Sequence, residues 1–276
     1  MNDRAEPVPT VRLETVDSTS LLARREIDSG ALAPEGRPTP RFYIAREQTG
    51  GIGRHGRSWH SPPGGLWCTL AWPVLDGATP DANQIAAGLG LRVGVVCLSI
   101  IAESLTRRMS RVMPQLKWPN DVLLKRRKVC GSLCEALVNP ASIAPQLGAH
   151  PTPRTTWFLI GVGINVNNDP RDLPDDLRRQ PIAMKDCTGD HLEIDLDELA
   201  SSLRAGLLHA VTTDGLDEHT LRLARERLYG AGNTINIVAQ DGLMTSGTLV
   251  GLSDSGAPIL RTGEVEFEVP PGTELQ

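Results

Sequence analysis

Hydrophobic and polar positions follow two periods along the chain, and the longer period predicts three helices. Apolar side chains recur at helical spacing over residues 83–106, which predicts one long helix that can lie across a sheet. Leucines stand at positions 196, 199, 203 and 207, after Asp195 and Glu198 at the spacing of a capping box. A shorter helix, LLARREI, is predicted after the cap residues at 17–20.

Short apolar runs between turn signals predict a β-sheet. Turns are expected at SPPGG (61–65), at residues 119–121 and at KRRK (125–128), while 139–154 and about 168–190 are predicted to be loops. The predicted strands cover residues 42–45, 66–74, 116–118, 122–124, 129–138 and 157–166.

The pattern changes at Gly230 to short alternating strands separated by turn residues. Val265, Phe267 and Val269 alternate with Glu266 and Glu268, which is the pattern of a strand. A small all-β barrel of about 45 residues fits this spacing. We therefore predict a larger domain over residues 1–228 and a small barrel over 229–276.

Composition excludes several classes of protein. With 276 residues and 40% hydrophobic content, the chain can bury one large core and a small satellite domain. Its net charge of -5 gives no overall field that attracts nucleic acid. The apolar stretch over 93–102 is about half as long as a membrane span and predicts a buried helix. Five cysteines without framework spacing, and no signal peptide before Val11, predict a cytoplasmic protein without disulfides.

One local sequence, GGIGRHGRSW (50–59), concentrates glycine and positive charge in this acidic chain. It matches the dinucleotide fingerprint GxGxxG and nearly matches a P-loop, but both motifs need a helix after the loop, which SPPGG prevents. Two interpretations remain. One is a mobile loop that wraps a ligand while Arg54 and Arg57 hold phosphate or carboxylate, and the other is a plain solvated loop. Taken alone, the loop favours the second.

Further motifs accompany this loop in a fixed order. The chain reads DSTS at 17–20, GIGRHGRSWHSPPG at 51–64, KWPND at 117–121, RRKVCGSLCE at 126–135 and GVGIN at 161–165. With these motifs, and with GTLVGLSDSGAPIL near its end, the sequence resembles the biotin protein ligases, also called biotin–acetyl-CoA-carboxylase ligases. The likeness extends from about Val11 to the C-terminus.

The resemblance implies an α+β fold, with a mixed β-sheet and helices on one side, similar to class II aminoacyl-tRNA synthetase cores, followed by an SH3-like barrel. It implies that the 1–228 domain joins biotin to AMP from ATP with release of pyrophosphate, with Mg²⁺ present. The biotinoyl group then passes to a lysine of a biotin carboxyl carrier protein of acetyl-CoA carboxylase or a related carboxylase. Many members add an N-terminal winged helix, but about ten residues precede Val11, so we expect a ligase that binds neither DNA nor membrane. The alternatives are a lipoate or octanoate ligase and a non-catalytic biotin- or nucleotide-binding module.

The resemblance also assigns the ligand site. Ser18, Thr19 and Gln48 match the ureido-binding positions, although a helix cap explains the first two equally well locally. Two positions depart from the family pattern, because Ser20 stands in place of Asn and Ile52 in place of Arg. The implied biotin and adenylate contacts are Ser18, Thr19, Ser20, Gln48, Gly51, Ile52, Gly53, Arg54, Arg57, Trp59, Asn120, Lys128, Gly131, Leu133 and Asn165.

Catalysis requires cations, because a carboxylate and an α-phosphate repel each other by about 4 kcal/mol at 4 Å and an effective dielectric of 20. By resemblance Arg54 and Lys128 contact the junction of the two groups, although Lys128 alone could be the last charge of a solvated turn. Asn120 and Asp121 would lie near Mg²⁺ and the reacting lysine, and such residues are also common in turns. The implied catalytic set is Arg54, Lys117, Asp121 and Lys128. Asn165 would hold the biotin tail or the adenylate, or be structural.

Overall fold

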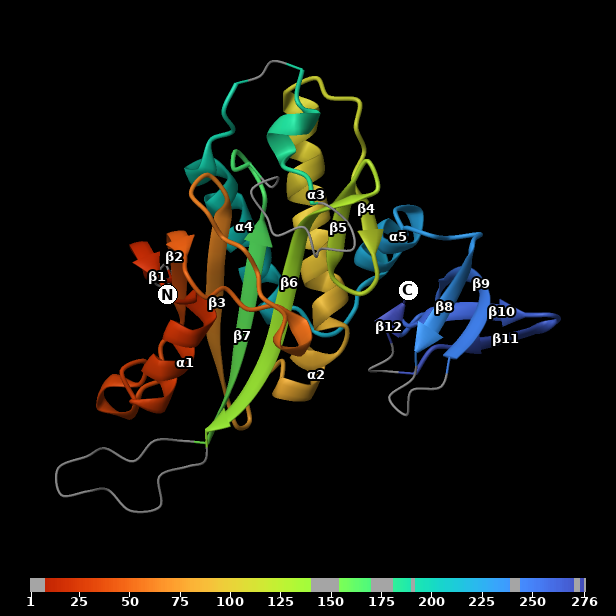
Figure 1. Cartoon of the computed structure of the whole chain (residues 1–276). Helices are drawn as coiled ribbons and strands as arrows, with labels where there is room; N and C mark the ends of the chain where they lie inside the picture. The colour runs from red at the N-terminus through yellow and green to blue at the C-terminus, as the bar shows by residue number, and fades with distance from the viewer. Residues whose placement is uncertain are drawn as a thin grey trace.

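The structure is a computed structural model that describes residues 8–139, 154–169, 181–189, 192–238, 244–270 and 274–275. The strands of its main sheet are β1 (Thr10–Val16), β2 (Arg41–Gln48), β3 (Leu66–Leu75), β4 (Gln115–Lys117), β5 (Asp121–Leu124), β6 (Arg127–Asn139) and β7 (Thr155–Ile164). Their order is β1-β2-β3-β7-β6-β5-β4 (Figure 1). β1 runs parallel to β2, and the other neighbouring pairs are antiparallel. The mixed sheet predicted from the sequence is confirmed.

Helices cover both faces of this sheet, unequally. They are α1 (Thr19–Asp28), α2 (Ala82–Ala86), α3 (Leu89–Arg107), α4 (Leu196–Thr212) and α5 (Glu218–Glu226). Successive residues of a strand point to opposite faces. Accordingly Leu70 of β3 belongs to the large core that includes α3 and α4, whereas Ala71 packs in a small cluster with Ala23 of α1. The prediction of helices on one side was therefore wrong for α1, which lies against the opposite face.

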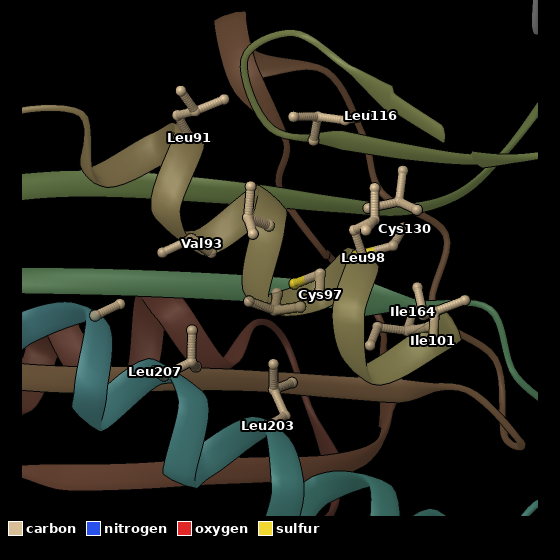
Figure 2. Packing of buried hydrophobic residues seen from close by; sticks show 14 of the residues in the cluster. Leu91, Val93, Cys97, Leu98, Ile101, Leu116, Cys130, Ile164, Leu203 and Leu207 are labelled. Carbon is tan, nitrogen blue, oxygen red and sulfur yellow. The ribbon is translucent and has the colours of Figure 1, made fainter. Parts of the chain in front are cut away.

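The large core is built around α3. Figure 2 shows Leu98 and Ile101 of α3 between the leucines of α4 and the strands that carry Cys130 and Ile164. α3 has the length and the mean hydropathy, 1.7, of a membrane-spanning helix, but 67% of its apolar window is buried inside the protein. The buried helix predicted over 93–102 is confirmed.

The long helix predicted over 83–106 is interrupted before α3. Gly88 adopts a φ of 64°, the left-handed conformation that glycine enters most easily, and it separates α2 from α3. Arg92 is 3% exposed and spans the interruption. The last carbonyls of a helix lack partners within it, and this single guanidinium serves the ends of two helices. It donates to the carbonyls of Ile85, Ala87, Ala210 and Thr213.

Several local features differ from the prediction. β1 and α5 were not predicted, and the described part of the predicted loop at 168–190 contains one turn of 3-10 helix, Met184–Cys187. The rest of that loop, and residues 140–153 of the other, lie outside the described residues. Asp195 caps α4 as expected. The Glu198 carboxylate, however, contacts Arg107 of α3 instead of completing a capping box.

The C-terminal sheet contains β8 (Thr234–Val238), β9 (Met244–Leu252), β10 (Pro258–Thr262), β11 (Val265–Glu268) and β12 (Glu274–Leu275). Their order is β11-β10-β9-β8-β12, with no pairing between the two edge strands, so the described residues form an open sheet and not a closed barrel. The alternating run became β11, in which Val265 pairs with Thr262 at the tip of a hairpin and is 65% exposed. The domain boundary after residue 228 stays a prediction.

Candidate functional site

Three glycines of the adjacent strands β6 and β7 lie on the α1 face of the main sheet. Gly163 of β7 pairs with Gly131 of β6, and Gly161 lies on the same face two residues earlier. A Cβ on Gly161 would lie 2.8 Å from Ser20 Oγ, and one on Gly131 would lie 2.9 Å from Lys128 Nζ. A Cβ on Gly163 would overlap the indole of Trp59. Glycine at these positions thus lets a hydroxyl, an indole and an ammonium group lie directly on the sheet, and we call the three glycines together with these covering groups the glycine trough.

Neutral hydrogen-bonding groups gather at the Gly161 end of the trough, where α1 begins. Ser18 is the N-cap of α1 and accepts from the backbone N–H of Leu21. Thr19 donates to Gln48 Oε1 through both its backbone N–H, at 2.8 Å, and its hydroxyl, at 3.1 Å. The structure therefore brings together the three residues that match ureido-binding positions, namely Ser18, Thr19 and Gln48, and places Ser20 beside them.

The loop between β2 and β3 returns Trp59 to the trough. Ile52 and Ser58 form an isolated bridge around a single turn of 3-10 helix, Arg54–Gly56. Gly51 lies so close to Trp59 that a Cβ there would overlap the Trp59 carbonyl oxygen, and its own carbonyl accepts from the Trp59 N–H at 2.8 Å. Glycine at position 51 is thus needed to seat Trp59. A strand, β3, follows this loop, which agrees with the rejection of both phosphate-binding fingerprints.

A cation lies at the Gly131 end of the trough. Lys128 Nζ lies 2.7 Å from Asp121 Oδ1 and 5.0 Å from the centroid of the Trp59 ring. Lys125 and Arg126 occupy the tight turn before it with positive φ and are exposed. Lys128, by contrast, folds back onto Gly131 and is half-buried. The alternative, in which Lys128 is only the last charge of the solvated KRRK turn, therefore does not describe the position of this side chain.

The KWPND segment reaches this end from a neighbouring strand. Asn120 is 5% exposed, its Nδ2 donates to the carbonyl of Ser132, and its Oδ1 accepts from Arg54 Nη1 at 3.4 Å. Arg54 of the loop is thereby held near the Lys128–Asp121 pair. Lys117 is the partner of Asp121 across the β4–β5 hairpin, and Arg57 is exposed in the loop. The loop that carries Arg54 thus meets the neighbouring strands β5 and β6 at the cation end.

Asn165 serves the structure beyond the end of β7. Its Oδ1 accepts from Asn168 Nδ2 at 2.9 Å, its N–H donates to the carbonyl of Val129, and its carbonyl accepts from the N–H of Met184. These contacts match the structural explanation that the sequence left open. A ligand contact by Asn165 stays a prediction, as do the roles of the other assigned residues.

The sequence reasoning missed Thr69, Gly161 and Gly163. Thr69 is fully buried on β3 and its hydroxyl contacts those of Thr19 and Ser20, at 2.8 and 2.9 Å. One hydroxyl in the otherwise apolar run LWCTLAW was the available signal. The GVG of GVGIN was the other, because glycines two residues apart on a strand leave one face bare.

The described residues contain no group of three or more His, Cys, Asp or Glu side chains that could hold a metal ion. Asn120 Oδ1 and Asp121 Oδ1 already contact Arg54 and Lys128. This donor set fits an Mg²⁺ that arrives bound to nucleotide phosphates better than a resident ion, since Mg²⁺ is often held by one or two carboxylates together with substrate phosphates.

Comparisons with known proteins identify relatives of this chain. The model of the biotin/lipoate A/B protein ligase family matches residues 20–144. The chain is 30% identical over 270 residues to the biotin–[acetyl-CoA-carboxylase] ligase of Paracoccus denitrificans, covering 95% of this chain and 98% of that protein. It is 27% identical to the bifunctional ligase/repressor BirA of Bacillus subtilis (strain 168), covering 88% of this chain and 68% of that protein.

A solved structure shares the fold. The biotin protein ligase from Aquifex aeolicus, in complex with biotin and ATP, is similar with a TM-score of 0.69 at 22% identity, covering 97% of this chain and 98% of that one. The fold and the sequence relatives together define a ligase. The chain belongs to the biotin/lipoate A/B protein ligase family, and the resemblance drawn from its motifs is confirmed.

Proposed function

We propose that this protein activates biotin with ATP to biotinoyl-5'-AMP, releasing pyrophosphate, and then transfers the biotinoyl group to a lysine of a biotin carboxyl carrier protein. One observation carries the proposal, namely the order of chemical groups along the trough. Hydroxyls and an amide lie at the Gly161 end, glycine backbone and the Trp59 indole in the middle, and Lys128 with Arg54 at the Gly131 end. Biotin has the same order, from the ureido ring through the apolar thiophane ring and valeryl chain to the carboxylate.

The neutral end suits the ureido ring. A cyclic urea is uncharged, donates through two N–H groups and accepts through its oxygen, so it needs neutral partners of both kinds. Ser18, Thr19 and Gln48 supply hydroxyl and amide groups at the start of α1. Trp59 and Leu133, which pairs with Gly161 across β6 and β7, flank the apolar part.

The cation end suits the first reaction step. A carboxylate oxygen of biotin bonds to the α-phosphorus of ATP while the bond to the β-phosphate oxygen breaks, and pyrophosphate leaves with that electron pair. Arg54 and Lys128 would offset the repulsion between the two anions. Asp121 holds the Lys128 ammonium in place at 2.7 Å, while Arg57 and Lys117 are proposed to meet the phosphates.

The second step needs a neutral amine. The carrier lysine attacks the acyl carbon, and AMP leaves as the amine gives up its proton. An ordinary lysine of pKa about 10.4 is only about 0.1% neutral at pH 7.4, so a nearby carboxylate that orients the amine or accepts its proton would help. We assign this role to Asp121, which is the carboxylate at the cation end. The same proposal places the protein in the cytoplasm, where its five free thiols stay reduced.

The test is pyrophosphate release by the purified protein with biotin and ATP together and with each alone. Release that needs both, followed by transfer of labelled biotin to an apo carrier domain, is the expected result. Release with lipoate or octanoate but not biotin would favour the lipoate-type alternative. Biotin binding without pyrophosphate release would favour a binding module.

A further inference from the structure

Five side chains form a continuous run of hydrogen bonds behind the neutral end of the trough, which we call the hydroxyl chain. Its successive distances are 2.8, 3.1, 2.8 and 2.9 Å. Thr69 at its centre is fully buried, and Ser20 at its end lies against Gly161. The members, in order, are Ser61, Gln48, Thr19, Thr69 and Ser20.

The Gln48 amide sets the direction of these bonds. The Thr19 backbone N–H can only donate, and it faces Gln48 Oε1 at 2.8 Å, so the oxygen and nitrogen of the amide are distinguished by geometry. Gln48 Nε2 therefore points at Ser61 Oγ, at 2.8 Å, and donates to it. The Ser61 hydroxyl in turn donates to the carbonyl of Trp59 at 3.1 Å.

The direction then passes through the hydroxyls. Gln48 Oε1 has no hydrogen, so the Thr19 hydroxyl, 3.1 Å away, donates to it, since otherwise two lone-pair oxygens would face each other. A hydroxyl has one proton. Thr69 must therefore donate to Thr19, and Ser20 must donate to Thr69. Ser20 Oγ is left with lone pairs and no proton for a ligand.

We propose that Thr69 is a positioning residue that makes Ser20 a pure hydrogen-bond acceptor toward the bound ligand. This inference rests on the proposed function and deepens it, because it states which edge of the cyclic urea faces Ser20. That edge is an N–H and not the carbonyl oxygen. The family has Asn at this position, and an Asn side chain presents both a donor and an acceptor. Ser20 presents only an acceptor, because its proton is donated to the buried Thr69.

Binding of two biotin analogues by calorimetry tests this assignment. Each analogue is a cyclic carbamate in which one of the two ureido N–H groups is replaced by a ring oxygen. One of them places a lone pair against Ser20 and should bind wild-type protein at least about tenfold more weakly than biotin. In Thr69→Val the Ser20 proton is released and can donate to that oxygen. The penalty for this analogue should then fall at least about fivefold, while the penalty for the other analogue stays constant.

Two further variants complete the experiment. Thr69→Ser keeps the hydroxyl and should keep the wild-type penalties. Ser20→Ala removes the facing lone pairs and should lower the same penalty that Thr69→Val lowers, which provides a second test if Thr69→Val fails to fold. A purely structural Thr69 would weaken biotin and both analogues by one common factor, and that result would overturn the proposal.

Failure of the proposed function would look different. Wild-type protein that bound neither biotin nor either carbamate and released no pyrophosphate would overturn the proposed function and this inference together, whereas biotin binding without pyrophosphate release would overturn only the activity. Tight biotin binding with carbamate penalties that neither Ser20→Ala nor Thr69→Val changes would overturn the hydroxyl direction alone.

Discussion

Trp118 Nε1 donates a hydrogen bond to the carbonyl of Gly256 at 2.9 Å, and this bond joins the KWPND segment to the C-terminal sheet. Gly256 adopts a φ of 79° between β9 and β10, and a Cβ there would lie 2.8 Å from Leu91 Cδ2 and 2.9 Å from Leu216 Cδ2. A left-handed glycine thus lets the turn approach the main domain closely. Because Asn120 and Asp121 follow Trp118 in the chain, the C-terminal sheet is connected to the cation end of the trough.

Replacing Trp118 with Phe should slow adenylate formation without unfolding the protein. The change removes one N–H and keeps an aromatic ring, and a neutral hydrogen bond contributes about 0.5–1.5 kcal/mol. We expect pyrophosphate release to fall roughly three- to tenfold. Asp254→Ala is the matched control, because it breaks the Arg225–Asp254 ion pair of the same interface at an exposed carboxylate, and such pairs contribute little. Equal rates in the two variants would contradict a coupling through Trp118.

Much of the fold could be predicted because it depends on local patterns. The period-2 run over 66–74 became β3, and the leucine spacing after Asp195 became α4. The interruption at Gly88 depends on Arg92 reaching the ends of two helices, and no local pattern contains that contact. β1 was missed because it is an edge strand with one neighbour, and α5 because only Leu221 and Ala224 of its nine residues are buried.

The candidate site could likewise be predicted only in part. The motifs assigned four residues to one site, and the structure brings them together in two pairs, Arg54 with Asn120 and Lys128 with Asp121. The motifs could not predict the part played by Thr69, because its hydrogen bonds join β3 to the first turn of α1 across about 50 residues of chain. The exposure of Val265 has a related cause, since it depends on the place of this residue at a hairpin tip and not on the alternating pattern.

Lys128→Ala should lower pyrophosphate release at least about tenfold, because a lost charge-assisted contact costs about 1.5–3 kcal/mol. The KRRK turn offers its own control in Lys125, which is exposed and donates to the carbonyl of Asp186. Lys125→Ala should keep the wild-type rate in the same assay. If the two alanine variants behaved alike, the placement of Lys128 at the reacting groups would be wrong.

Buried thiols should make the free energy of unfolding depend on pH. Burial raises the pKa values of Cys68 and Cys130 well above the ordinary range, and desolvation raises the pKa of the partly buried Cys134 to about 12. In the unfolded chain a thiol ionises near pKa 8.5. Because the pKa of each thiol is higher in the folded protein than in the unfolded chain, its contribution to the free energy of unfolding is fully present below about pH 8.5. This contribution is lost as the pH rises above that value.

Each of these thiols should lower the free energy of unfolding by up to about 1.4 kcal/mol for every pH unit above about pH 8.5. Urea unfolding at intervals from pH 8 to 9.5 measures this slope, and Cys130→Ala should make it shallower by one thiol. A free energy of unfolding that stays constant over this range would refute the interpretation.

Ile52 provides the last prediction. The family pattern has arginine at this position, while Arg54 and Arg57 are retained in this chain. Ile52 is half-buried and pairs with Ser58 at the base of the loop that seats Trp59. If position 52 faces the adenylate, a guanidinium there would add a forked contact to the phosphate. Ile52→Arg should then lengthen the half-life of enzyme-bound biotinoyl-adenylate by roughly 10- to 100-fold, for a contact of about 1.5–3 kcal/mol.

The half-life is measured in both proteins after free biotin and ATP are removed, by following the bound adenylate over time. Ile52→Met is the control for size, because it keeps an apolar side chain and adds no charge. Should Ile52 instead pack as an apolar anchor of the closed loop, arginine would hinder closure and the adenylate would be lost at least as fast as from wild type. An equal or shorter half-life in Ile52→Arg therefore rules out the electrostatic role, and a longer one that Ile52→Met does not share supports it.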